Sequence, residues 1–162
     1  MMAGCGDSPT PGEVEAPIEV VDPTPPAIIV PNLPPEPAAE AEATNRSLST
    51  VGARMVFDQA TMTAPTGPLR LSYTSQSTEP AMLHNLLIVR AGAEDAVGIA
   101  GIDAGPDKGY APDHDAVLAA SQLLAPGESA EIFVTLKPGV YTYICTFPGH
   151  YLTEKGVLTV TE

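Results

Sequence analysis

Short runs of alternating apolar and polar residues, separated by turn signals, occupy the chain from about residue 49 to its end. One such run, Glu131 to Leu136, lies between the turn pairs Pro126-Gly127 and Pro138-Gly139. Runs of this length and spacing are typical of an all-β sandwich, because each strand buries one face and exposes the other. We expect strands at residues 51–57, 61–64, 69–73, 82–90, 131–136, 140–145 and 156–161.

One segment departs from this pattern. Residues 91–105 could form a helix with Glu94 and Asp95 in its first turn, although Gly98 and Gly101 lower its helix propensity. Residues 49–162 are numerous enough for a two-layer core. The predicted fold is therefore an all-β, Greek-key β-sandwich of seven or eight strands with one short helix or flap.

The N-terminal part of the chain has a different composition. Residues 1–50 contain ten of the eighteen prolines and eight of the twenty acidic residues, but no aromatic residue. Such a segment buries too little apolar surface to offset the entropy that ordering costs. We expect residues 5–48 to form a disordered Pro/Glu-rich tether, followed by a folded domain over residues 49–162.

The run from Met2 to Cys5 places small residues directly before a cysteine. This pattern looks like the cleavage site of a bacterial lipoprotein signal, with residues 1–4 as its remnant and Cys5 as the lipidated residue. The apolar stretch that such a signal needs is missing from the four residues before Cys5. A free cysteine in the tail is the other interpretation. A lipid on Cys5 would anchor the protein outside the cytoplasm, in the periplasm or on the outer face of the cytoplasmic membrane.

The net charge of −13 restricts the partners that the chain can bind. Nucleic acid is anionic as well, so we expect no nucleic-acid partner. A docking site for a basic protein is compatible with this charge, and so is a role in solubility alone.

A cysteine and a histidine five residues apart, Cys145 and His150, lie between two predicted strands. A loop of this length can turn a thiolate and an imidazole onto one metal ion, and Pro148-Gly149 supplies the reversal. His84, in an apolar run upstream, offers a second imidazole. Two His and one Cys with a weak fourth ligand are typical of copper electron-transfer sites. Either residue type alone is more often an ordinary core residue.

The residues beside these candidates have predicted supporting roles. The backbone N–H groups of Asn85 and Phe147 are placed to stabilise a metal-bound thiolate. The Asn85 side chain is expected to hold the loop by a hydrogen bond near Thr146.

The segment from Cys145 to His150 resembles the ligand loop of the cupredoxins, the blue copper proteins, and His84-Asn85 resembles their upstream ligand pair. The resemblance covers roughly residues 50–162 and is strongest to the auracyanin and azurin members, through Tyr141 to Cys145 and Pro148 to Tyr151. It implies a Greek-key sandwich with one copper ion. It also implies a protein that carries single electrons between complexes outside the cytoplasmic membrane.

The resemblance fails at Glu154. The family has a Met four residues after the loop His as a weak axial ligand, whereas all five methionines of this chain lie upstream of the loop. A carboxylate favours Cu(II) over Cu(I), so ligation by Glu154 predicts a lowered reduction potential and a changed visible spectrum. Protonation of Glu154 should weaken ligation and raise the potential as pH falls. A surface carboxylate turned to solvent, with three ligands on the metal, is the alternative.

The predicted function is single-electron transfer by one Cu(I)/Cu(II) ion, in a monomer that exchanges electrons with a cytochrome or a membrane electron-transfer complex. An enzyme is not expected, because no catalytic acid, base or second metal cluster accompanies the ligands. The alternative is a copper- or zinc-binding protein that handles metal without redox cycling. Electrons are expected to pass through an exposed edge of His150, within an apolar surface formed by Pro148, Tyr151 and Leu152.

Overall fold

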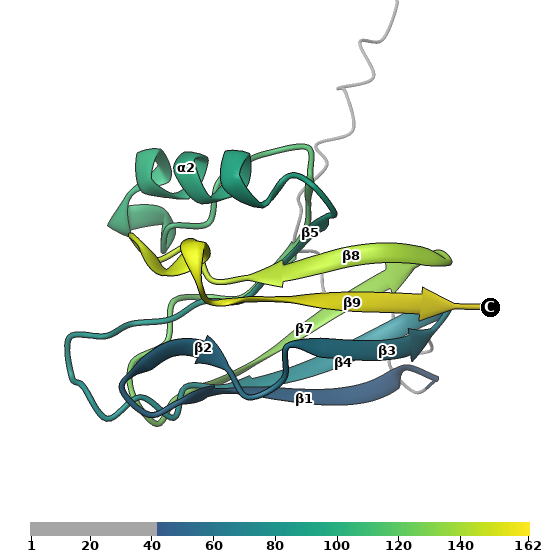
Figure 1. Ribbon diagram of the computed structural model, residues 1–162, viewed down its shortest axis with the longest axis horizontal. Helices are drawn as coiled ribbons and strands as arrows, with labels where there is room; N and C mark the ends of the chain where they lie inside the picture. Colours follow the sequence, from purple (N-terminus) through teal and green to yellow (C-terminus); the bar gives the residue numbers. More distant parts are fainter. Residues whose placement is uncertain (1–41) are drawn as a thin grey trace, which may run out of the picture.

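The computed structural model describes residues 42–162, which form two packed β-sheets with a helix against one of them (Figure 1). The strand order is β2-β1-β4-β7 in one sheet and β3-β9-β8-β5-β6 in the other. This is the predicted, mostly β sandwich with one short helix. The remnant at 1–4, the lipid on Cys5 and most of the tether are predictions that lie outside the described residues.

The elements have the following bounds. The first sheet consists of β1 (Thr44–Val51), β2 (Arg54–Phe57), β4 (Gly67–Thr74) and β7 (Ser129–Leu136). The second consists of β3 (Thr61–Pro65), β5 (Leu87–Arg90), β6 (Val117–Ala120), β8 (Gly139–Ile144) and β9 (Lys155–Thr161). The helical segments are α2 (Glu94–Ala104) and the 3-10 turns η1 (Pro106–Lys108) and η2 (His150–Leu152).

Residues 42–162 contain nine strands, against the seven or eight expected. The segment predicted as one strand at 51–57 contains a reversal instead, because Gly52 adopts a left-handed φ of 54° between β1 and β2. The strand β1 begins at Thr44, so the folded part starts before the boundary expected at residue 49. Its apolar alternation is weak, with Leu48 as the apolar side chain that it buries, and parallel pairing with β4 holds it in place.

Two further differences concern the second sheet. The strand expected at 82–90 is limited to β5, and His84 joins Leu124 through an isolated antiparallel bridge. The short strand β6 was not predicted, because its sequence Val-Leu-Ala-Ala has neither alternation nor length. The predicted helix within 91–105 is present as α2.

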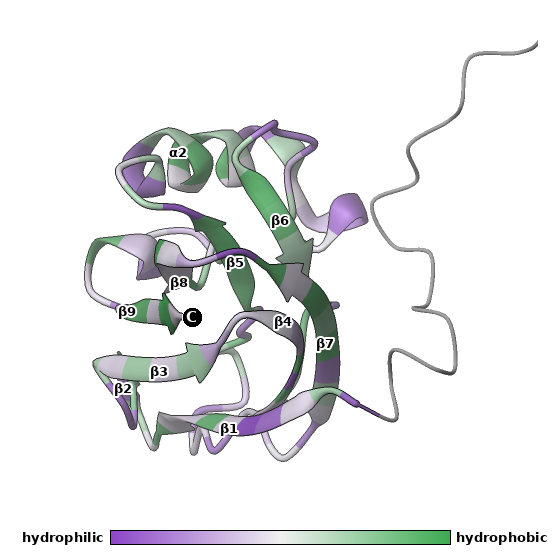
Figure 2. Cartoon of the chain, turned by 90° about the vertical axis from the view of Figure 1, so that its right-hand side faces the viewer, coloured by the Kyte–Doolittle hydropathy of each residue, from purple (hydrophilic) through white to green (hydrophobic). Residues whose placement is uncertain are grey.

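The main core lies between the two sheets. The strand β4 shows how it forms, since Leu69, Leu71 and Tyr73 alternate with more exposed residues and point inward. Figure 2 shows further hydrophobic stretches in β5, β6 and part of β7. Each large apolar side chain that is fully buried in this way stabilises the fold by about 1.5–3 kcal/mol.

A second apolar cluster fixes α2 to the outer face of the five-stranded sheet. Val97 of the helix is fully buried in the same cluster as Val89 of β5 and Ile144 of β8. As a result α2 lies over the turn η2, which follows β8 in the chain (Figure 1). The helix therefore covers one side of the segment that carries the predicted ligands.

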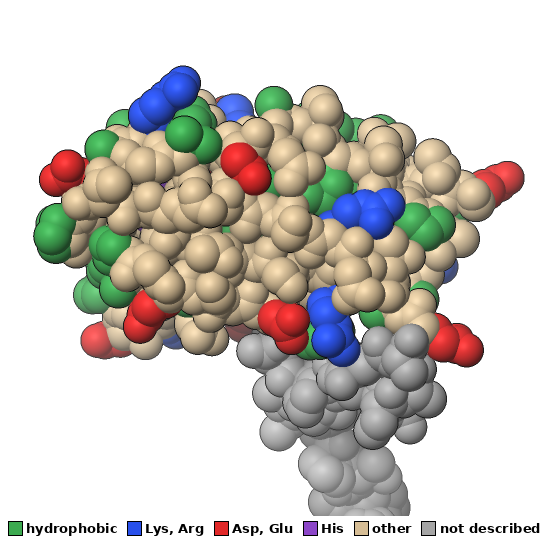
Figure 3. Space-filling view, turned by 90° about the horizontal axis from the view of Figure 1, so that it is seen from below, with side chains coloured by type: hydrophobic (Ala, Val, Ile, Leu, Met, Phe, Trp, Pro, Cys, Tyr) green, Lys and Arg blue, Asp and Glu red, His purple; other side chains and the backbone are tan. Residues whose placement is uncertain are grey.

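The charged side chains are dispersed on the face of the molecule shown in Figure 3. Basic and acidic groups are interspersed there, with no patch of a single sign. Within the described range, no helix has the length and apolar character needed to cross a membrane.

Candidate metal centre

Strands β8 and β9 hold the two ends of the loop that carries three predicted ligands. Cys145 follows β8 and Glu154 precedes β9, and the Cys145 backbone N–H donates to the Glu154 carbonyl at 3.0 Å. Gly149 has a φ of 87°, which turns the chain into η2. The Glu154 N–H then donates to the His150 carbonyl at 2.7 Å. This closed loop brings the three side chains to one place.

His84 reaches the same place from a separate segment. Its backbone N–H donates to the Leu124 carbonyl at 3.0 Å, and its carbonyl accepts from the Leu124 N–H at 2.7 Å. This two-way bridge fixes the backbone of His84 independently of the loop.

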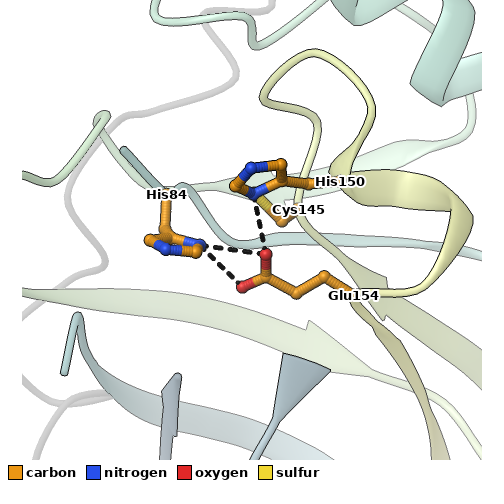
Figure 4. A group of neighbouring side chains, drawn as sticks. All are labelled: His84, Cys145, His150 and Glu154. Carbon is orange, nitrogen blue, oxygen red and sulfur yellow. Dashed lines mark hydrogen bonds and ion pairs between the residues drawn. The ribbon is translucent and has the colours of Figure 1, made fainter. Parts of the chain in front are cut away.

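Four side chains meet in the buried cluster shown in Figure 4. Their ligand atoms all lie within 4.8 Å of one another. Three of the residues have no exposed surface, and His150 is 4% exposed. The structure thus brings together every residue predicted as a ligand, and the alternative of a Glu154 carboxylate turned to solvent is wrong. We call these residues the ligand cluster: His84, Cys145, His150 and Glu154.

The two imidazoles present the same nitrogen atom to the centre of the ligand cluster. The Nδ1 atom of His84 lies 2.9 Å from each carboxylate oxygen of Glu154. The Nδ1 atom of His150 lies 2.9 Å from Oε2 of the same carboxylate and 3.6 Å from Sγ of Cys145. Two nitrogen donors, one sulfur donor and one oxygen donor therefore converge.

Burial and hydrogen bonding act in opposite directions on the two acidic groups. Burial favours the neutral form of Glu154, but hydrogen bonds from His150 and His84 outweigh it and hold the pKa of Glu154 below its ordinary value. Burial raises the pKa of Cys145 well above its ordinary value, and the charge of Glu154 adds to this. A cation at the centre would reverse the second effect, because a coordinated thiol loses its proton.

Asn85 connects the two segments that supply the ligands. Its Oδ1 accepts from the Thr146 backbone N–H at 2.7 Å, and its Nδ2 donates to the Thr146 hydroxyl at 2.9 Å. The Thr146 hydroxyl donates in turn to the Tyr110 carbonyl at 2.6 Å. Backbone N–H groups of Asn85 and Phe147 donate to the Cys145 sulfur and favour its thiolate. The residues expected to support the site thus lie against it and fix the distance between its two halves.

The side of the ligand cluster nearest the surface is apolar. Phe147 packs edge-on against His150, with ring centroids 4.9 Å apart. Pro148 is exposed and Leu152 is 60% exposed, whereas Tyr151 is half-buried. His150 is the one member of the cluster with any exposed surface, although less than the sequence analysis expected.

Two glycines allow α2 to approach the loop closely. A Cβ atom added to Gly98 would lie 2.3 Å from Cγ of Tyr151, and one added to Gly101 would lie 2.8 Å from Cβ of Thr146. In the sequence these glycines indicated only a weak helix. Their packing role could not be recognised there, because the contact joins segments more than forty residues apart.

Sequence reasoning did not single out Tyr73 as a residue of the site. A strand was expected at residues 69–73, and the structure buries the Tyr73 side chain in the core. What the sequence could not indicate is the packing of the two sheets, which places the Tyr73 hydroxyl close to Glu154 and Cys145.

The donor set of the ligand cluster fits copper. A soft thiolate and two imidazoles suit both Cu(I) and Cu(II), and the carboxylate supplies a fourth donor. The general model of copper-binding proteins of the plastocyanin/azurin family matches residues 44–161. This chain belongs to that family. Proteins of this family bind copper, and the ligand cluster is a site that could hold one such ion.

Individual members of the plastocyanin/azurin family agree with this assignment. The chain is 34% identical to auracyanin-A of Chloroflexus aurantiacus over 113 residues, which cover 67% of this chain and 69% of that protein. It is 33% identical to outer membrane protein H.8 of Neisseria meningitidis serogroup B over 99 residues, or 58% of this chain. The match spans about half of H.8, at 53% of its length.

A solved structure gives the same result for the fold. The crystal structure of dithionite-reduced auracyanin from Roseiflexus castenholzii superposes with a TM-score of 0.69 and 33% sequence identity. The superposition covers 74% of this chain and 98% of auracyanin. The fold is therefore the cupredoxin-like sandwich that the resemblance implied.

Proposed function

We propose that this protein carries single electrons on one copper ion held by the ligand cluster. The observation that carries the proposal is the convergence of two Nδ1 atoms, one Sγ atom and one carboxylate in a site with almost no exposed surface. When bound, copper would supply the redox chemistry by cycling between Cu(I) and Cu(II).

The protein's own contribution is a frame that changes little between the two oxidation states. His84 is fixed by its bridge to Leu124, and Cys145 by the ends of β8 and β9. Asn85 joins these two parts through Thr146. A donor set held in this way need not rearrange when an electron arrives or leaves, which favours rapid transfer.

Glu154 is proposed as the fourth ligand, in place of the axial Met that the family resemblance implied. Its carboxylate is buried and lies 2.9 Å from Nδ1 of both imidazoles, so it would be available to an ion held by these donors. A hard anionic donor stabilises Cu(II) more than Cu(I). The site should therefore have a lower reduction potential than one with a thioether in this position.

Electron exchange is proposed to occur through His150, the member of the ligand cluster that reaches the surface. The apolar residues Pro148, Tyr151 and Leu152 lie around it and would form the contact with a redox protein, either a cytochrome or a membrane electron-transfer complex. The protein is proposed to act as a monomer without enzymatic activity. Placement outside the cytoplasm, with a lipid on Cys5, rests on the sequence from Met2 to Cys5 and on the similarity to an outer membrane protein.

A reductive titration of the Cu(II)-loaded protein, followed by visible absorption, tests the proposal. An electron carrier should show a thiolate-to-copper charge-transfer band that bleaches on reduction and returns fully on reoxidation. The control Cys145→Ser should lack the band. A wild-type protein without the band, or one that loses its metal on reduction, would contradict electron transfer and favour a copper- or zinc-handling role.

A further inference from the structure

Tyr73 carries a buried hydroxyl group without a visible partner. The residue has no exposed surface, and among residues 42–162 no group meets its oxygen in hydrogen-bonding geometry. Its ring is fixed by the core, with Phe57 in an edge-on contact at 5.9 Å between centroids. A buried hydroxyl without a partner destabilises a protein, so its presence calls for an explanation. A phenylalanine would fill the same space without this cost.

The Tyr73 hydroxyl lies beneath the ligand cluster. Burial raises the pKa of Tyr73 above its ordinary value, and the charges of Glu154 and Cys145 and the nearby Glu154 side chain add to this. Tyr73 also belongs to the same apolar cluster as Cys145. The hydroxyl therefore lies on the core side of the ligand cluster.

The hydrogen bonds of Glu154 explain what this hydroxyl could do. Both carboxylate oxygens are at present bonded to Nδ1 of His84, and one of them also to Nδ1 of His150. An imidazole nitrogen that binds a metal ion no longer has a proton to donate. If both imidazoles bind an ion, they no longer donate to Glu154. The carboxylate oxygen that does not bind the ion would then be buried without a hydrogen-bond donor. Such an oxygen requires a new donor.

We propose that Tyr73 is a positioning residue for the metal site, whose hydroxyl donates a hydrogen bond to the carboxylate oxygen of Glu154 that does not bind the metal. The bond draws electron density away from the carboxylate and so limits how strongly Glu154 binds Cu(II). The inference rests on the proposed function, since it requires copper in the ligand cluster with Glu154 as a ligand.

The test compares Tyr73→Phe with the wild type in the Cu-loaded protein. Loss of one hydrogen bond to a charged group should raise the ratio of Cu(II) to Cu(I) affinity about tenfold. That change corresponds to a fall of about 59 mV in the one-electron potential. The thiolate charge-transfer band should shift as well. In a Glu154→Met background the same substitution should change neither quantity, because a thioether accepts such a bond only weakly.

Tyr143→Phe is a matched control. Tyr143 is also fully buried in the core, but its hydroxyl donates to the Gln59 carbonyl at 2.8 Å. Its removal should lower the stability of the fold and leave the potential unchanged. Tyr73→Phe should instead change the potential and leave the fold intact. In urea denaturation, the copper-free variant should be at least as stable as the copper-free wild type.

Several outcomes would overturn the inference. An unchanged potential and band in Tyr73→Phe would do so, as would an equal change in the Glu154→Met background. A loss of stability in the copper-free Tyr73→Phe protein would point to a structural role instead. Absence of the band in the wild type would contradict the proposed function itself, so the two failures can be told apart.

Discussion

The two sides of the ligand cluster differ in composition and in exposure. On the core side, Glu154 and Tyr73 are polar groups with no exposed surface, and Tyr73 is enclosed by apolar side chains. On the outer side, Pro148 and Leu152 are apolar groups exposed to solvent. The usual distribution of polar and apolar residues is thus inverted on both sides. The difference suggests that the core side sets the chemistry of the ion, and the outer side sets which molecules can approach it.

The packing of α2 on the outer side offers the strongest way to disturb this arrangement. Gly98→Ala should improve helix propensity, yet its Cβ atom would overlap the ring of Tyr151, at 2.3 Å from Cγ. We expect the steric overlap to outweigh the gain in helix propensity. The free energy of unfolding, measured by urea denaturation, should fall by about 1–3 kcal/mol. With the ring removed by Tyr151→Ala, adding Gly98→Ala should instead stabilise the protein. Destabilisation that is equal in both backgrounds would show that this contact does not matter.

The exposed apolar surface on the outer side leads to a second prediction, which concerns the rate of electron self-exchange. Leu152→Asp places a charge beside His150 and should slow electron self-exchange between oxidised and reduced copies roughly tenfold, measured by NMR line broadening. The visible spectrum should not change and the potential should change little, because Leu152 is not a ligand and solvent screens a charge at this exposed position.

Val140→Asp is the control for this rate. Val140 is similarly exposed, at 55% against 60% for Leu152, but lies at the opposite end of β8 from Cys145. Equal slowing in both variants would attribute the effect to net charge rather than to a contact surface around His150.

A smaller effect, on the pH dependence of stability, is expected at Glu94 in the first turn of α2. Burial would raise the pKa of Glu94, but hydrogen bonds from the Thr142 hydroxyl and from backbone N–H groups outweigh it and hold the pKa below its ordinary value of 4.5. A carboxyl group with a lowered pKa stabilises the folded state above that value, and the contribution is lost as pH falls through the folded-state pKa.

Glu94→Gln should therefore cost less than about 1 kcal/mol near neutral pH. It should also flatten the decline in stability between about pH 6 and pH 3, measured by denaturant unfolding at each pH. Asp95→Asn, an exposed neighbour in the same helical turn, is the control. A decline that is as steep in Glu94→Gln as in the wild type would contradict this role for Glu94.

The sequence was most informative on the outer side of the site and in the loop. The spacing of Cys145 and His150, together with an upstream imidazole and a β-rich context, was enough to select three members of the ligand cluster, and Glu154 was found through the family resemblance. The bond between Asn85 and Thr146 was also expected. These inferences succeeded because they concern residue types that are rare at such spacings, and strand ends that a short loop must join.

The sequence was least informative where contacts between distant segments decide the structure. The strand β1 has little apolar alternation and depends on pairing with β4. The glycines of α2 looked unfavourable until the ring of Tyr151 was seen against one of them. The position of Tyr73 beneath Glu154 depends on how the two sheets pack. No local pattern encodes these three features, since each is a property of the assembled fold.

Ligation of copper by Glu154 is tested most directly by comparing the wild type with Glu154→Met. Visible absorption, EPR and reduction potential of the Cu-loaded proteins would be measured under identical conditions. We predict that the substitution raises the potential by roughly 100–200 mV and shifts the charge-transfer spectrum toward that of a blue copper site. An unchanged potential and spectrum would show that Glu154 is a buried partner of the two imidazoles without a bond to the metal.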